Sequence, residues 1–264
     1  MTFFFGTNLK MHGTPAQTTA FVEALEAGLK VYRGTNLQPF VLPPFTSLPG
    51  LSACTERLWL GAQNMHWADE GAYTGEISPV MLRALGTEMV LLGHAERRHT
   101  FGETDELIRK KVESAARRGL RVLLCVGETG LEKERGTGIE VVSAQLETAL
   151  SGLGGPGAER LLVAYEPVWA IGACGREAKP GEVRASLRGV RKTLRTLFAH
   201  DVPVLYGGSV NEENCAAYAS LPETDGLFVG RAAWRATGFL RVLALSLEAR
   251  RAVQSSISVS ERSP

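Results

Sequence analysis

Cysteine is scarce in this sequence, and the residues present form no motif. The four cysteines are far apart along the chain and include no CxxC pair: Cys54, Cys125, Cys174 and Cys215. A disulfide framework or a zinc site needs cysteines at close, regular spacing, so this distribution argues against both. We therefore expect reduced thiols, no bound metal and a cytoplasmic protein.

An excess of charge of either sign is also missing. Lys and Arg number 29 against 28 Asp and Glu, which gives a formal net charge of +1. Nucleic-acid-binding proteins usually carry a basic patch or tail, so the sequence predicts no nucleic acid partner. An anionic ligand would have to be held by local geometry.

Long apolar runs are the third absence. No run approaches the roughly 20 residues that cross a bilayer. Residues 1–6 are apolar, but they are too short for a signal peptide and lack its basic start. The sequence therefore predicts no membrane partner, which again favours the cytoplasm.

What the chain does contain is an alternation of two patterns. We identify eight short apolar runs, at Phe3–Thr7, Pro39–Leu42, Leu58–Gln63, Met89–Leu92, Val122–Val126, Leu161–Tyr165, Val204–Tyr206 and Gly226–Val229. Because their apolar residues are continuous, these runs predict buried parallel strands. Segments of helical periodicity separate them, most clearly at Thr14–Lys30, Asp105–Arg118, Ile139–Ser151, Gly181–Ala199 and Ala232–Ala249.

This alternation favours a closed barrel. Eight strand–helix units in about 250 residues fit an α/β fold with a single-domain (β/α)8 architecture. An open doubly wound sheet would more often have five or six strands and a GxGxxG turn after the first, which the sequence lacks. We predict that residues 1–250 form the barrel and that residues 251–264 form a polar, flexible tail.

Three titratable residues lie within three residues of the ends of predicted strands, where the active site of such a barrel forms. They are Lys10 after the first run, His94 after the fourth and Glu166 after the sixth. A loop lysine is usually just solvated, and a histidine after a strand can be purely structural. A carboxylate at the apolar end of a buried strand is harder to explain in that way. Withdrawn from water, it holds a proton more readily and becomes a usable general base.

The other two residues suit complementary roles. His94 precedes residues 95–98, which resemble the start of a short helix. The positive end of a helix dipole disfavours the imidazolium, and a neutral ring can donate a proton at pH 7. A fixed ammonium at Lys10 would attract an anionic substrate and stabilise developing negative charge.

Glycine and serine gather in the last three strand-end loops. The residues are Gly172, Gly207, Gly208, Ser209 and Gly230. Single glycines usually mark turns, but backbone N–H groups after the last strands of a barrel commonly hold phosphate. By contrast, we interpret Gly127, Glu128 and Thr129 after the fifth run as structural.

Five strings in this order resemble the triosephosphate isomerase family from about Phe5 to Leu245. They are Asn8-x-Lys10, Gly93-His94-x-Glu96-Arg97-Arg98, Cys125–Glu128, Ala164–Gly172 and Tyr206–Asn211. The resemblance implies an isomerase with no cofactor that acts on a small phosphorylated sugar. Glu166 would be the base, His94 the neutral electrophile, and Lys10 with Asn8 the donors to the substrate oxygens.

The resemblance also assigns supporting residues. Glu96 would orient Lys10, and Ser209, Gly230 and Arg231 would contact the substrate or its phosphate. A lid over residues 167–176 would close on the phosphate through Gly172. Its first residues would be Pro167, Val168, Trp169, Ala170 and Ile171. A homodimer is implied as well, with an interface that includes Tyr73, Thr74, Gly75, Glu76 and Arg97. Thr74 would be the tip of this interface loop, and Glu76 would pair with Arg97.

Several positions depart from the family pattern. Ala95 stands for a usual Ser, Leu9 and His12 stand for Trp and Asn, and residues 172–176 of the lid differ. Residues 230–234 read Gly-Arg-Ala-Ala-Trp where Gly-Gly-Ala-Ser-Leu is usual, and residues 63–69 contain an unusual His–Trp pair. All these changes spare Lys10, His94 and Glu166.

Two substrates remain open. The first is the triose pair dihydroxyacetone phosphate and glyceraldehyde 3-phosphate, interconverted in glycolysis and gluconeogenesis. The alternative is a tetrulose phosphate in polyol catabolism, such as L-erythrulose 1-phosphate converted to D-erythrulose 4-phosphate. A lyase on the same barrel would need a Schiff-base lysine within a strand or a metal cluster. A non-catalytic sugar-phosphate-binding barrel would be expected to have lost Glu166 or Lys10.

Overall fold

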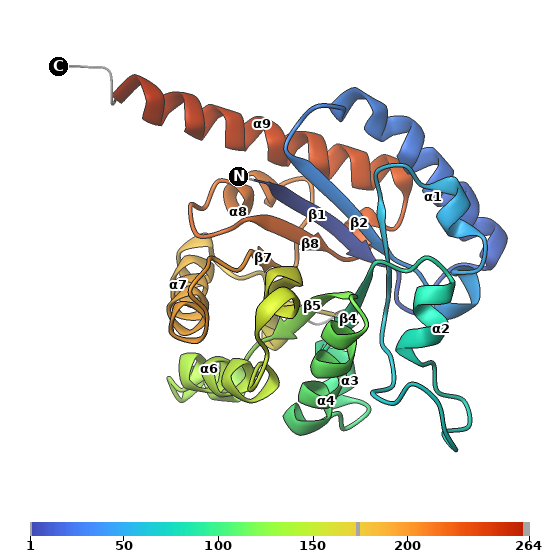
Figure 1. Ribbon diagram of the computed structural model, residues 1–264. Helices are drawn as coiled ribbons and strands as arrows, with labels where there is room; N and C mark the ends of the chain where they lie inside the picture. The colour runs from blue at the N-terminus through green and yellow to red at the C-terminus, as the bar shows by residue number, and fades with distance from the viewer. Residues whose placement is uncertain (1, 173–174, 261–264) are drawn as a thin grey trace.

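The computed structural model describes residues 2–172 and 175–260 (Figure 1). Its strands are β1 (Phe3–Asn8), β2 (Leu37–Leu42), β3 (Trp59–Ala62), β4 (Met89–Leu92), β5 (Arg121–Val126), β6 (Leu161–Tyr165), β7 (Val204–Tyr206) and β8 (Gly226–Val229). All neighbours are parallel, and they close into a barrel in chain order. The predicted (β/α)8 barrel is therefore confirmed, with strand ends within two residues of the predicted runs.

Helices surround the barrel. They are α1 (Pro15–Leu29), α2 (Pro79–Ala84), α3 (Ala95–His99), α4 (Asp105–Arg117), α5 (Gly130–Glu134), α6 (Gly138–Ala149), α7 (Pro180–Leu197), α8 (Cys215–Ala219) and α9 (Ala236–Ser260). The long helices pack side by side on the outside, with α4 beside α6, α6 beside α7 and α1 beside α9. Side chains cap the starts of α1 and α4; Thr104, for example, accepts a hydrogen bond from the backbone N–H of Leu107 at 3.3 Å.

Helix α9 runs further than the sequence pattern suggested. It continues past Ala249 to Ser260 and extends beyond α8 toward the C-terminus (Figure 1). The first ten residues of the predicted tail are therefore helical in the structure, and residues 261–264 lie outside the described part. In residues 2–172 and 175–260, no helix has both the length and the apolar character needed to cross a membrane.

The strands have two buried faces. One set of side chains fills the barrel, where Phe40 stacks on Phe228 at 5.8 Å between ring centroids. The alternate set packs under the helices. Gly6 makes room for the inner layer, because a Cβ there would lie 2.3 Å from the Phe40 ring. Since all strands are parallel, their carboxyl ends and the loops that follow meet at one rim.

Candidate active site

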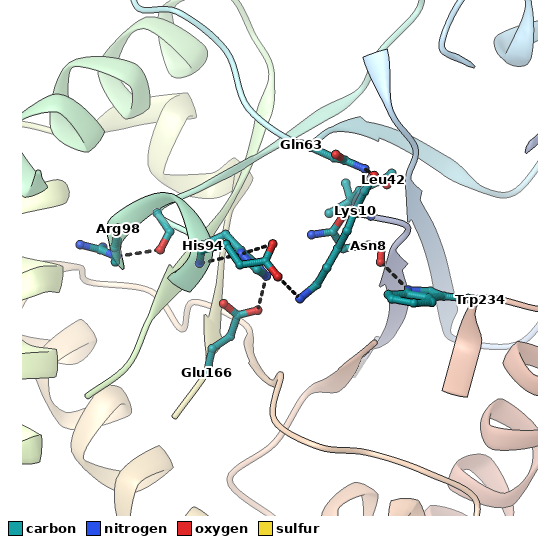
Figure 2. A network of polar contacts seen from close by, with 10 residues as sticks. Asn8, Lys10, Leu42, Gln63, His94, Arg98, Glu166 and Trp234 are labelled. Carbon is teal, nitrogen blue, oxygen red and sulfur yellow. Dashed lines mark hydrogen bonds and ion pairs between the residues drawn. The ribbon is translucent and has the colours of Figure 1, made fainter. Parts of the chain in front are cut away.

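The strand-end residues predicted to carry the chemistry line one cavity of about 580 Å³. Its lining includes Asn8, Lys10, His94 and Glu166, together with residues after β6, β7 and β8. A volume of this size suits a small organic ligand. Figure 2 shows the side chains of Lys10, His94 and Glu166 directed toward one another from three separate strand ends.

The side chain of Glu166 is buried, with 3% of the residue's surface exposed. Its backbone N–H donates to the carbonyl of Val126 at 2.8 Å, which fixes the residue at the end of β6 beside β5. Oε1 lies 3.8 Å from Nε2 of His94. Oε2 is buried and has no hydrogen-bond partner among the described residues. A buried acceptor without a partner is costly, and such groups concentrate at functional sites.

The backbone after β4 determines which ring nitrogen of His94 carries the proton. His94 caps the short helix α3, and its Nδ1 accepts a hydrogen bond from the backbone N–H of Glu96 at 3.2 Å. A nitrogen that accepts a hydrogen bond carries no proton, so the remaining proton of the neutral ring lies on Nε2. Because Nε2 faces Glu166, a neutral donor is aimed into the cavity.

The turn that precedes His94 is anchored from two sides. Gly93 has φ +71°, and a Cβ there would lie 2.9 Å from the carbonyl oxygen of Cys125. Arg98 donates to the carbonyl oxygens of Gly93 at 2.7 Å and Cys125 at 3.2 Å, and it also pairs with Asp105. The bond to Cys125 ties the histidine loop to β5, and Figure 2 shows Arg98 beside His94 in this loop.

Lys10 stands in an unusual backbone conformation. Its φ of +52° is the only positive value at a non-glycine residue in the described part of the chain. Its own N–H donates to Oδ1 of Asn8 at 2.8 Å, and its carbonyl accepts from Nε2 of Gln63 at 2.8 Å. Nζ pairs with Oε1 of Glu96 at 2.6 Å. The lysine is thus held at its backbone and at its tip.

The predicted phosphate contacts line the same cavity. Gly172, Ser209, Gly230 and Arg231 all line it. Ser209, Arg231 and Gly172 are exposed, so a charged ligand can reach them from solvent. Arg231 begins a short 3₁₀ turn after β8 (Arg231–Ala233) and has no ion-pair partner within residues 2–172 and 175–260.

The lid segment is anchored by Glu128, which the sequence analysis interpreted as structural. Glu128, 5% exposed, accepts hydrogen bonds from the hydroxyl of Tyr165 at 3.0 Å and from Nε1 of Trp169 at 2.7 Å. Burial, together with the nearby Glu128 charge, raises the pKa of Tyr165, so the hydroxyl remains a donor. Lys133 lies 3.3 Å from the centroid of the Trp169 ring.

Other predicted lid residues are distributed unevenly. Ile171 lines the cavity, Pro167 and Ala170 are buried, and Val168 is half-buried. Residues 173 and 174, which the sequence analysis counted among the altered lid positions, lie outside the described residues.

The predicted interface residues lie outside the cavity. Tyr73, Thr74, Gly75 and Glu76 are exposed on the loop between β3 and α2. The Tyr73 ring packs on His66 with 4.0 Å between centroids. Within the chain Arg97 pairs with Glu103 at 3.4 Å, and no Arg97–Glu76 ion pair occurs in the described residues.

Two further residues at the site escaped the sequence analysis as contributors. Gln63 and Trp234 reach the Asn8–Lys10 turn from the ends of β3 and β8 (Figure 2). Trp234 was noted only as a departure from the family pattern. No local pattern marks such residues, because their partners are 53 and 226 positions away.

The fold and cavity together define a (β/α)8-barrel enzyme equipped for acid–base chemistry on a small molecule. The model of the family described as triosephosphate isomerase matches residues 3–246. The chain belongs to the triosephosphate isomerase family and is an isomerase, which confirms the resemblance drawn from the sequence.

Proteins of similar sequence bear on the choice between the two candidate substrates. The L-erythrulose-1-phosphate isomerase of Rhizobium rhizogenes is 44% identical over 245 residues, which cover 92% of this chain and 94% of the relative. The protein of the same name from Brucella abortus is 44% identical over 92% of this chain and 95% of its own length. That of Mesorhizobium japonicum is 45% identical over 91% and 96%. These relatives favour the alternative substrate over the triose placed first, and they lend no support to a place in glycolysis or gluconeogenesis.

Proposed function

We propose that this chain isomerises a four-carbon ketose phosphate, converting L-erythrulose 1-phosphate to D-erythrulose 4-phosphate. The observation that carries the proposal is its 44% identity, over nearly the whole of both chains, to a protein named L-erythrulose-1-phosphate isomerase. The cavity with Lys10, His94 and Glu166 supports the chemistry that such a reaction needs.

Dihydroxyacetone phosphate and L-erythrulose 1-phosphate share most of their atoms. Starting from the phosphate, each has a methylene carbon, then a carbonyl carbon, then the carbon that loses a proton. L-erythrulose 1-phosphate differs by one hydroxymethyl group on that reacting carbon. The distance from phosphate to reacting carbon is therefore the same in both. The extra group has to be accommodated near Glu166 and His94, away from Arg231.

The proposed reaction moves a carbonyl between two adjacent carbons. Glu166 takes the proton from C3, and the electron pair forms the C2–C3 double bond of an enediolate. The Nε2–H of His94 protonates the oxygen on C2, and the same nitrogen takes the proton from the oxygen on C3. The protonated Glu166 returns a proton to C2, which leaves the carbonyl at C3. All atoms are conserved, and no redox partner is needed.

Lys10 supports the charged intermediate. Its ammonium group stabilises the negative charge that develops on the enediolate oxygens. Its short contact with Glu96 and the clamped backbone turn keep the ammonium in place before substrate binds. Groups fixed in advance need no reorganisation during the reaction, and this is where most of their catalytic value lies.

We also propose a homodimer. Three exposed apolar side chains lie on loops at the same rim, after β1, β3 and β4. They are Met11, 94% exposed, Tyr73, 45%, and Phe101, 67%. Covering such side chains by a second copy would gain the hydrophobic free energy that solvent exposure forgoes. Light scattering on the protein as it elutes from a size-exclusion column tests the dimer proposal, and a monomer at micromolar concentration would overturn it.

The substrate is charged and does not cross a bilayer unaided, which favours a cytoplasmic location for the protein.

The substrate proposal is tested by measuring kcat/KM on L-erythrulose 1-phosphate and on glyceraldehyde 3-phosphate with the same preparation. We expect the tetrulose to be preferred by at least about 100-fold, a difference of about 2.7 kcal/mol in transition-state binding. A Glu166→Gln variant is the control and should lose both activities. Equal or greater efficiency on the triose would overturn the four-carbon assignment.

A further inference from the structure

Trp234 connects two loops of the cavity that the reaction uses separately. It follows the short turn Arg231–Ala233 after β8, and its ring lines the cavity. Its indole Nε1 donates a hydrogen bond to the backbone carbonyl of Asn8 at 2.8 Å (Figure 2). The loop after β8 is thereby joined to the loop after β1, its neighbour in the barrel.

The loop that Trp234 contacts is the one under strain. Lys10 adopts a left-handed backbone conformation, which costs a residue with a Cβ free energy that the surroundings must supply. Inside the turn, Asn8 Oδ1 accepts from the N–H of Lys10. From outside, Gln63 donates to the carbonyl of Lys10, and Trp234 donates to the carbonyl of Asn8. The strained turn is therefore held between donors from β3 and from the β8 loop.

The indole is itself fixed in place. The ring packs against His12 with 4.3 Å between centroids. The backbone N–H of Trp234 donates a hydrogen bond to the carbonyl of Arg231 at 3.3 Å. A donor on a half-buried, packed ring loses little conformational freedom when it forms its bond. A flexible side chain at position 234 would hold Asn8 less firmly.

We infer that Trp234 is a positioning residue, which fixes the Asn8–Lys10 turn and so places the ammonium group of Lys10 over the reacting carbons. This inference rests on the proposed catalytic role of Lys10 but does not depend on which sugar phosphate is the substrate. The indole acts on turnover through Lys10, whereas the phosphate is held by other groups of the cavity.

The three possible roles of Trp234 predict different effects on kcat, KM and stability. If it positions Lys10, removing its N–H lowers kcat and leaves KM almost unchanged, because the phosphate contacts persist. If it only packs the loop after β8, the change raises KM and weakens inhibition by inorganic phosphate, with kcat unchanged. A general structural role would lower thermal stability without this separation of kcat and KM.

The test is Trp234→Phe, which removes the N–H donor and keeps an aromatic ring in the cavity wall. We expect kcat to fall about fivefold, the loss that corresponds to one ordinary neutral hydrogen bond. KM and the inhibition constant of inorganic phosphate should stay within about twofold of wild type. The matched control is Trp59→Phe, at the start of β3 and the opposite end of the barrel, which should leave kcat unchanged.

Each variant and the wild type are assayed separately on L-erythrulose 1-phosphate and on glyceraldehyde 3-phosphate. A wrong substrate assignment shows in the wild type alone, whereas a wrong role for Trp234 shows as an unchanged kcat in Trp234→Phe on whichever substrate the wild type converts. If Trp234→Phe does not fold, His12→Ala removes the ring that packs against the indole. A fall in kcat of at least about twofold with constant KM supports the inference, and an unchanged kcat overturns it.

Discussion

Adding one methyl group at Gly207 should displace the proposed catalytic base. Gly207 follows β7, and its N–H donates to the carbonyl of Tyr165 at 2.9 Å, directly before Glu166. A Cβ on this residue would lie 2.9 Å from Cγ of Glu166, 3.3 Å from its Oε1 and 3.4 Å from Cδ1 of Phe228. The glycine therefore provides the space that the glutamate side chain occupies.

The size of the effect follows from these distances. Carbon atoms in contact prefer a separation of about 3.5 Å or more, so Cγ of Glu166 would have to move by roughly 0.6 Å. Displacing a reacting group by about 1 Å can cost a factor of about 100 in rate. We therefore expect Gly207→Ala to lower kcat by about tenfold or more. Overpacking of this kind also costs about 1–3 kcal/mol of stability.

Steady-state kinetics and a thermal unfolding curve measure the two effects. The control is Gly181→Ala near the start of α7, where a Cβ would meet no heavy atom within 4 Å. That variant should keep wild-type turnover. A Gly207→Ala enzyme with kcat within about twofold of wild type would refute the reasoning, because it would show that the position of Glu166 is not set by this contact.

Three further perturbations have defined outcomes. Glu166→Asp withdraws the carboxylate by about one methylene, so kcat should fall by at least about 100-fold while the circular dichroism spectrum stays unchanged; unaltered turnover would contradict its role as base. Arg231→Gly removes an exposed cation beside the predicted phosphate contacts, so KM should rise by similar factors for triose and tetrulose substrates, and a change confined to one of them would contradict the placement. A hydrogen bond from Lys133 lowers the pKa of Glu182 to about 2 from a usual value of 4.5. Its stabilisation is present above pH 4.5 and disappears as the pH falls toward 2, so the melting temperatures of wild type and Glu182→Gln should differ at pH 6 and converge toward pH 2; a constant difference would contradict this.

The strand pattern was readable from the sequence because each strand is buried on both faces. Met89–Leu92 and Leu161–Tyr165 are continuous apolar runs that match β4 and β6 in full. The short helices were not readable in this way. Helix α8, Cys215–Ala219, spans little more than one turn and is too short to show a period of 3.6 residues. Helix α9 exceeded its predicted end, since no glycine or proline marks a stop between residues 249 and 260.

For the site, the sequence by itself determined which chemical groups stand at the strand ends. Lys10, His94 and Glu166 each lie within two residues of the end of a strand, and parallel strands bring their carboxyl ends to one rim. Only the tertiary structure decided how those groups are held. The left-handed turn at Lys10 accepts hydrogen bonds from Gln63 and Trp234, which follow the strands β3 and β8. Such contacts are set by three-dimensional packing, so no local pattern of residues encodes them.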